Sequence, residues 1–178
     1  QEVCRAAPTG VQDHLGDTEA PPPVLDLIEF YSRNLAVPAR RDVGDPVVLK
    51  GKEVFYRLRC VACHRAKYVT AKDATHPEHR FQLIWPYSDL LLHDMGEGLA
   101  DGQTVGMASG REWRTPPLWG IGLTKTVSGH TYFLHDGRAR SLLEAILWHG
   151  GEAQTARDGF VALDPASRVA LLRFLKSL

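Results

Sequence analysis

Apolar residues recur at helical spacing in four stretches of the chain. Apolar side chains three or four positions apart lie on one face of an α-helix, so each stretch predicts an amphipathic helix. The predicted helices cover residues 24–35, 46–60, 142–149 and 165–178. The fold predicted from this pattern is therefore mostly α.

Three of these helices begin at residues typical of helix starts. Pro46 and Pro165 occupy first helical positions, where the fixed φ of proline suits a helix and no amide hydrogen is needed. Ser141 precedes its helix, and Glu144 follows three residues later. This is the spacing of a capping box, in which both side chains bind backbone N–H groups of the first turn. Asp164 is the predicted N-cap of the last helix.

The remaining segments predict an N-terminal arm and long loops. Residues 1–23 are rich in Pro, Gly, Asp and Thr and lack an apolar period, which indicates an arm or linker. Residues 24–178 are then a single domain. Between residues 65 and 140, prolines and glycines interrupt every helical pattern, so long loops are expected there. One short hairpin is predicted around residues 127–133.

The charge balance excludes several classes of partner. Lys and Arg together number 21, as do Asp and Glu, so the formal net charge is zero. A neutral chain argues against a nucleic-acid-binding protein and against a basic membrane-surface protein. The apolar runs are far shorter than the roughly 20 residues that cross a bilayer, so no membrane span is expected.

The most informative motif is CVACH at residues 60–64. Two thiols three positions apart can each add across one vinyl group of haem, and the adjacent histidine then becomes the proximal iron ligand. A zinc site would need a second ligand pair, and a thioredoxin-like motif would need a βαβ setting. The motif therefore predicts one covalent haem c, attached through Cys60 and Cys63 and ligated by His64. Because c-type haem is attached outside the cytoplasm, we expect an exported, periplasmic protein.

Two regions resemble class I cytochrome c domains. Gly51, Phe55 and the motif at 60–64, together with Leu171 and Phe174, resemble the paired N- and C-terminal helices of those domains. In that family the glycine lets the two helices cross closely. The resemblance implies a class I cytochrome c-like helical domain with long loops that wrap the haem.

Four longer segments resemble the C-terminal half of the di-haem oxidoreductases, which include thiol-oxidoreductase-like and peroxidase-like proteins. These segments are YSDLLLHDMG at 87–96, EWRTPPLW at 112–119, FLHDGR at 133–138 and EAILWHGGE at 144–152. Bacterial di-haem cytochrome c peroxidase and the MauG-type enzymes are more distant relatives. Such proteins carry two CxxCH motifs and this chain has one. The resemblance therefore implies one haem domain of a larger protein, or a shortened relative.

The second axial ligand of the iron decides the chemistry. A second strong ligand makes the haem an electron carrier, whereas an open side makes it a candidate catalyst. The residues alone leave Met95, Met107, His149 and the other histidines as candidates. The resemblance aligns His149 with the ligand position, at the end of the short helix after the HDG turn at 135–137. His64 and His149 are thus the expected metal ligands, and Met95 is the alternative.

The expected function is the transfer of single electrons to or from a redox protein or a second haem domain. No catalytic residue is assigned. The alternative is a haem peroxidase or oxidoreductase with an open distal site, in which His149, His135 or His93 would supply a proton. Arg114 is expected to pair with a haem propionate, because a guanidinium binds carboxylates bidentately. The alternative for Arg114 is an exposed surface arginine.

Overall fold

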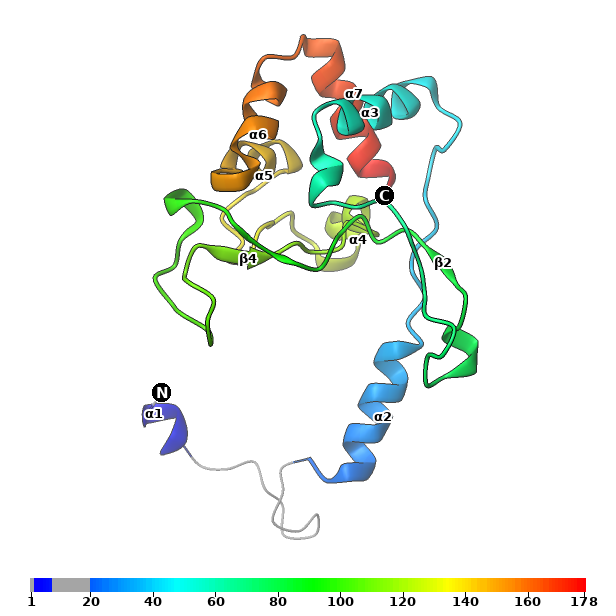
Figure 1. Cartoon of the computed structure of the whole chain (residues 1–178), viewed down its shortest axis with the longest axis vertical. Coiled ribbons are helices and arrows are strands. Elements are labelled where there is room, and N and C mark those ends of the chain that lie inside the picture. The colour runs from blue at the N-terminus through cyan, green and yellow to red at the C-terminus, as the bar shows by residue number, and fades with distance from the viewer. Residues whose placement is uncertain (1, 8–19) are drawn as a thin grey trace. The chain divides into compact units, whose positions relative to one another are not determined.

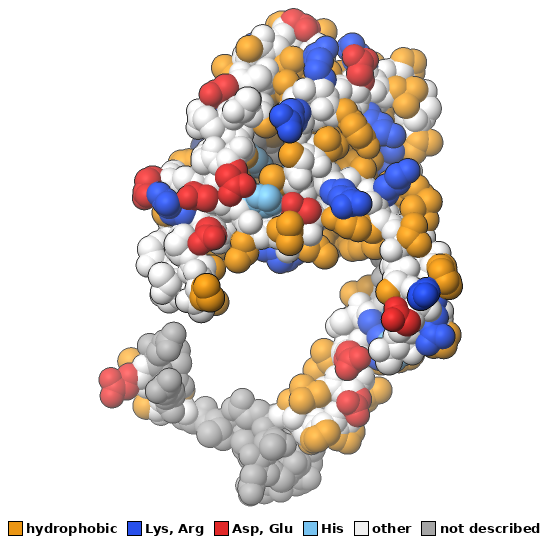
Figure 2. All heavy atoms as spheres, viewed as in Figure 1, with side chains coloured by type: hydrophobic (Ala, Val, Ile, Leu, Met, Phe, Trp, Pro, Cys, Tyr) orange, Lys and Arg blue, Asp and Glu red, His pale blue; other side chains and the backbone are white. Residues whose placement is uncertain are grey.

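The computed structural model describes residues 2–7 and 20–178, and the chain divides into two compact units, residues 1–37 and 38–178. The first unit contains α1 (Glu2–Arg5) and α2 (Pro22–Arg33). α2 confirms the helix predicted over 24–35, shifted toward the N-terminus. Apolar side chains are exposed along α2, and none of its residues is buried (Figure 2). The predicted arm of residues 1–23 falls largely outside the described residues.

The second unit is mostly α, with two small antiparallel strand pairs (Figure 1). Its helices are α3 (Pro46–Arg57), α4 (Thr124–Ser128), α5 (Leu142–Trp148), α6 (Gln154–Val161) and α7 (Pro165–Ser177). Single 3₁₀ turns lie at η2 (Cys60–Ala62), η3 (Pro77–His79), η4 (Glu97–Leu99), η5 (Ile121–Leu123) and η6 (Gly151–Ala153). Strand β1 (Tyr68–Val69) pairs with β2 (Leu83–Ile84), and β3 (Leu92–Asp94) pairs with β4 (Glu112–Arg114). Among the described residues, no helix has the length and apolar character that crossing a membrane requires.

The core forms where α3 and α7 cross (Figure 1). Gly51 of α3 lies directly against the backbone carbonyl of Ala170 on α7, so a Cβ at this position would overlap it. The close approach brings the buried rings of Phe55 and Phe174 to 5.3 Å between centroids. Leu171 is buried beside them. The glycine therefore allows the two helices to share one aromatic and aliphatic core.

The helix starts agree with the capping residues. The Ser141 hydroxyl accepts a hydrogen bond from the Glu144 N–H at 3.1 Å, and Asp164 accepts one from the Ser167 N–H at 2.9 Å. The Glu144 carboxylate departs from the usual capping box, because it accepts from the N–H of Arg140, one residue before the cap. The cap still satisfies first-turn donors, so α5 and α7 begin where the sequence predicts.

Two local predictions are corrected, and one helix was missed. The hairpin expected at 127–133 is wrong, because α4 covers part of this stretch and ends at Gly129 with a left-handed φ of 73°. The helix expected through residue 60 ends at Arg57, and Arg59 takes a left-handed φ of 61°. α6 was not predicted. Its sequence has no sustained apolar repeat, and Phe160 is its one buried residue.

A strap over residues 38–45 joins the start of the second unit to the end of α7. The Arg41 N–H donates to the Ser177 carbonyl at 2.9 Å, and the Arg41 guanidinium donates to the Lys176 carbonyl at 2.7 Å. Asp42 pairs with Arg173 at 3.0 Å. The last carbonyls of a helix have no partner within it, so the strap satisfies two of them.

Candidate functional site

The two cysteines of the CxxCH motif lie on the 3₁₀ turn that follows α3. The left-handed Arg59 turns the chain away from the helix just before Cys60. The His64 N–H donates to the Cys60 carbonyl at 2.9 Å, which closes the motif into one tight turn. Burial raises the pKa of the Cys60 thiol to about 11, and burial also raises the pKa of Cys63. Both thiols are therefore protonated at neutral pH.

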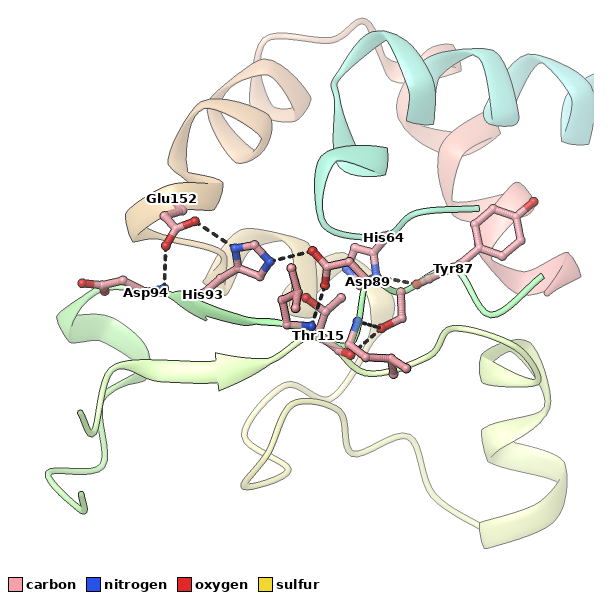
Figure 3. A network of polar contacts seen from close by, with 10 residues as sticks. His64, Tyr87, Asp89, His93, Asp94, Thr115 and Glu152 are labelled. Carbon is pink, nitrogen blue, oxygen red and sulfur yellow. Dashed lines mark hydrogen bonds and ion pairs between the residues drawn. The ribbon is translucent and has the colours of Figure 1, made fainter. Parts of the chain in front are cut away.

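The His64 imidazole is oriented by the backbone of a distant loop. Its Nδ1 donates to the carbonyl of Tyr87 at 2.9 Å (Figure 3). Burial lowers the pKa of His64 to about 4, although the hydrogen bond to Tyr87 opposes the shift. The ring is thus neutral, with its proton on Nδ1 and a lone pair on Nε2. This is the state in which a histidine binds a metal.

His149 has the same arrangement at the end of α5. Its Nδ1 donates to the carbonyl of Ala145, one turn earlier in the helix, at 2.7 Å. Burial lowers the pKa of His149 from its ordinary value. His149 is therefore also neutral at pH 7, and its Nε2 is the nitrogen that carries the lone pair.

The two imidazoles lie close together although 85 positions separate them in the sequence. Their ring centroids are 6.4 Å apart, and their planes differ by 46°. A metal–nitrogen bond is about 2.0 Å and a ring nitrogen lies roughly 1.1 Å from the ring centre, so two imidazoles on opposite sides of one ion have centroids about 6.2 Å apart. The separation of the His64 and His149 rings is therefore close to that of two imidazoles that bind one metal ion from opposite sides.

A third histidine lies between two carboxylates beside this pair. His93, on β3, donates from Nδ1 to Glu152 at 2.8 Å and from Nε2 to Asp89 at 2.8 Å (Figure 3). The hydrogen bond to Glu152, together with that to Asp89, raises the pKa of His93. Burial alone would raise the pKa of Asp89, but hydrogen bonds from Leu91 and His93 lower it. An imidazole that donates from both nitrogens is an imidazolium, so this cluster carries a cation between two anions.

The sequence pattern of one protein family matches residues 4–178, and its description reads "Di-haem oxidoreductase, putative peroxidase". The chain belongs to the di-haem oxidoreductase family. This confirms the resemblance found in the four motifs and extends it along almost the whole chain. Searches of curated proteins and of solved structures found no match to the chain. Membership implies haem binding and redox chemistry, and the fit of His64 and His149 agrees with both.

The other residues predicted to bind the haem of this di-haem oxidoreductase family member are Met95, Met107 and Arg114. Met95 follows β3 and is half-buried, and it lines a surface hollow with Trp148 and Gly150. Met107 is fully exposed on the β3–β4 connection. Arg114 is exposed at the end of β4. The structure thus brings His149 near His64, while ligation by His149 or Met95 and propionate binding by Arg114 stay predictions.

His135, a predicted proton donor of the alternative function, has a packing partner. Its ring stacks on Trp113 of β4, with centroids 3.4 Å apart and planes 8° from parallel. The Trp113 indole donates to the Leu99 carbonyl at 3.0 Å, which holds the stack in place. His135 also lies 3.8 Å from the carboxylate of Asp136. The stack gives His135 a structural role in the packing of this loop.

Sequence reasoning singled out His93 as a proton donor but missed both of its carboxylates. Glu152 is 59 residues from His93, and no spacing rule connects them. Asp89 and His93 are four positions apart, a spacing that predicts contact on a helix. Here the segment is extended and reaches the same contact through the left-handed φ of Leu90, 62°. Only the fold reveals this cluster.

Proposed function

We propose that this chain is a c-type haem domain that transfers single electrons. One haem would be attached through Cys60 and Cys63, with His64 and His149 on opposite sides of the iron. The observation that carries the proposal is the pair of neutral imidazoles with centroids 6.4 Å apart, each bound through Nδ1 to a backbone carbonyl. Carbonyl acceptors of this kind fix the ring orientation of metal-binding histidines and leave Nε2 for the metal.

The protein groups would hold a closed site. The haem supplies one-electron redox chemistry when bound. His64 and His149 would both bind the iron, which would leave no open position for a substrate oxygen. Tyr87 and Ala145 keep the rings in place, so little rearrangement is needed when the charge of the site changes. Arg114 is suited to a propionate, whose carboxylate its guanidinium would bind.

The family description also bears on partners. The family is di-haem, and this sequence contains one CxxCH motif. We infer that the electron partner is a second haem domain or another redox protein. Since covalent haem attachment takes place outside the cytoplasm, we propose a periplasmic location for the chain.

The test is the absorption spectrum of the haem-loaded chain, oxidised and reduced, with the haem content per chain measured on the same sample. We expect one covalent haem, a low-spin spectrum and no charge-transfer band of methionine–iron ligation. His149→Ala should become high-spin and bind added imidazole. Met95→Leu is the matched control and should keep the wild-type spectrum.

The other outcomes discriminate between the alternatives. A methionine–iron band that is lost in Met95→Leu would replace His149 by Met95 as the ligand. A high-spin wild-type spectrum would overturn the closed site and favour the peroxidase reading, for which turnover of hydrogen peroxide is the direct assay. A chain that carries no covalent haem would overturn the proposal altogether.

A further inference from the structure

The proposed electron-transfer site does not use the cluster of Asp89, His93 and Glu152. Asp89 and His93 lie on the one segment that leads into β3, Glu152 lies on η6, and the three side chains meet with two hydrogen bonds of 2.8 Å each (Figure 3). The side chains of His93 and Asp89 are only 16% and 11% exposed. The Glu152 side chain is 55% exposed, and both hydrogen bonds of His93 join an imidazolium to a carboxylate, which is the stronger kind of hydrogen bond.

The Asp89 end of this cluster is joined to the turn that bears His64. The Asp89 N–H donates to the carbonyl of Cys63 at 2.8 Å. Two residues earlier, the Tyr87 carbonyl accepts the hydrogen bond from His64. The Cys63 sulfur and the ligating atoms of Asp89 and His93 all lie within 4.8 Å of one another. Asp89 is thus fixed relative to the proximal histidine.

The Glu152 end is joined to the turn that follows His149. Glu152 stands three positions after His149, and its second carboxylate oxygen accepts the N–H of Asp94 at 2.9 Å. The intervening Gly150 and Gly151 lie directly against the backbone of residues 94–96. His149 itself has left the helix, with an extended backbone of φ −60° and ψ 123°. The position of this turn therefore bears on that of His149, and Glu152 adds side-chain bonds to His93 and Asp94 that hold the turn.

We propose that Asp89, His93 and Glu152 form a clamp that holds His149 at ligand distance from His64. The clamp is a positioning device and rests on the proposed bis-histidine site. His93 is its central link, because its two ring nitrogens bond to Asp89 on its own segment and to Glu152 on the turn after His149. Without the clamp, the turn after His149 would keep only its backbone contacts. His149 would then dissociate from the iron more readily.

The experiment compares four haem-loaded variants with the wild type by spin state and by affinity for added imidazole, which competes with His149. Glu152→Gln keeps the size of the side chain and an oxygen for the Asp94 N–H, but it removes the charge that faces His93. His93→Gln removes the central link. Glu112→Gln is the matched control, since Glu112 likewise accepts a backbone N–H, that of Ser109 at 2.7 Å, without bonding to either histidine. His149→Ala gives the value for a fully open site.

We expect Glu152→Gln and His93→Gln to show a high-spin fraction and an imidazole affinity raised roughly tenfold or more, as loss of a charge-assisted hydrogen bond predicts. Glu112→Gln should match the wild type. Low-spin clamp variants with wild-type imidazole affinity would overturn the clamp and leave the proposed function intact. A high-spin wild type would instead overturn the proposed function. Circular dichroism confirms that each variant is folded, and if one does not fold, the other decides.

Discussion

At the scale of single residues, three consecutive positions hold the site together. The Tyr87 carbonyl binds His64, the Ser88 hydroxyl binds two backbone groups, and Asp89 binds His93. Tyr87 and Leu90 take left-handed φ angles of 52° and 62°, which residues other than glycine rarely adopt. Such a backbone persists only where the surrounding bonds fix it. Two of those bonds come from the Ser88 hydroxyl, and another runs from the Asp89 N–H to the Cys63 carbonyl.

The buried Ser88 hydroxyl gives a prediction on stability. It donates to the Thr115 carbonyl at 2.6 Å and accepts from the Leu90 N–H at 2.9 Å, and Ser88 is fully buried. Ser88→Ala leaves both backbone groups without this partner, so the free energy of unfolding should fall by about 1–3 kcal/mol. Urea denaturation measures it. The control is Ser128→Ala at the exposed end of α4, where a change of similar size would contradict the assignment.

At the scale of elements, the crossing of α3 and α7 places the CxxCH turn. α3 ends three residues before Cys60, so any shift of α3 on α7 moves the motif with it. Phe55 connects the helix crossing to the CxxCH turn: its ring centroid is 5.3 Å from that of Phe174 and 6.3 Å from that of His64. A change in the packing of α3 on α7 is therefore expected to move His64 as well.

Gly51 is the position at which this crossing can be tested. Gly51→Ala should lower the free energy of unfolding by about 1–3 kcal/mol or more, because the new methyl group overlaps the Ala170 carbonyl and α3 must move. Gly44→Ala is the control, since a Cβ there meets nothing within 4 Å. Thermal or urea unfolding of the two variants side by side gives the comparison. Equal stabilities would mean that the helices tolerate a wider crossing.

The elements also show what the sequence can predict. Helices α3, α5 and α7 were predicted because their starts are encoded locally, by Pro46, Ser141 and Asp164. α6 and the two strand pairs were not, because they are stabilised by contacts with distant segments rather than by a local repeat. In the site, the CxxCH motif predicted His64 as the proximal histidine directly. His149 came from the family resemblance, and Glu152 from the fold alone.

At the scale of the whole molecule, the chain contains two compact units with different packing. All members of the buried core, from Val48 to Leu178, belong to the unit of residues 38–178. The strap of residues 38–45 is part of this unit through its bonds to the end of α7. The structure therefore predicts that residues 38–178 are stable, together with the proposed haem site, without residues 1–37.

Two truncations test this division. A haem-loaded chain that starts at Pro38 should unfold at the urea concentration of the full chain, within about 0.5 kcal/mol. A chain that starts at Pro46 loses Arg41, which bonds the end of α7, and Asp45, whose carboxylate caps α3 at 2.7 Å from the Val47 N–H. It should be less stable by at least about 1–2 kcal/mol. Destabilisation by the shorter deletion would show that residues 1–37 support the haem unit.

The burial of Cys60 has a consequence for the order of events in maturation. In the folded chain its thiol has a pKa of about 11 and packs against the core, so little thiolate exists to attack a vinyl group. Cys63 does not pack against this core, although burial raises the pKa of its thiol as well. If haem is attached as proposed, the Cys60 bond forms most readily before α3 settles on α7. Early closure of the core would then yield chains with a single thioether bond.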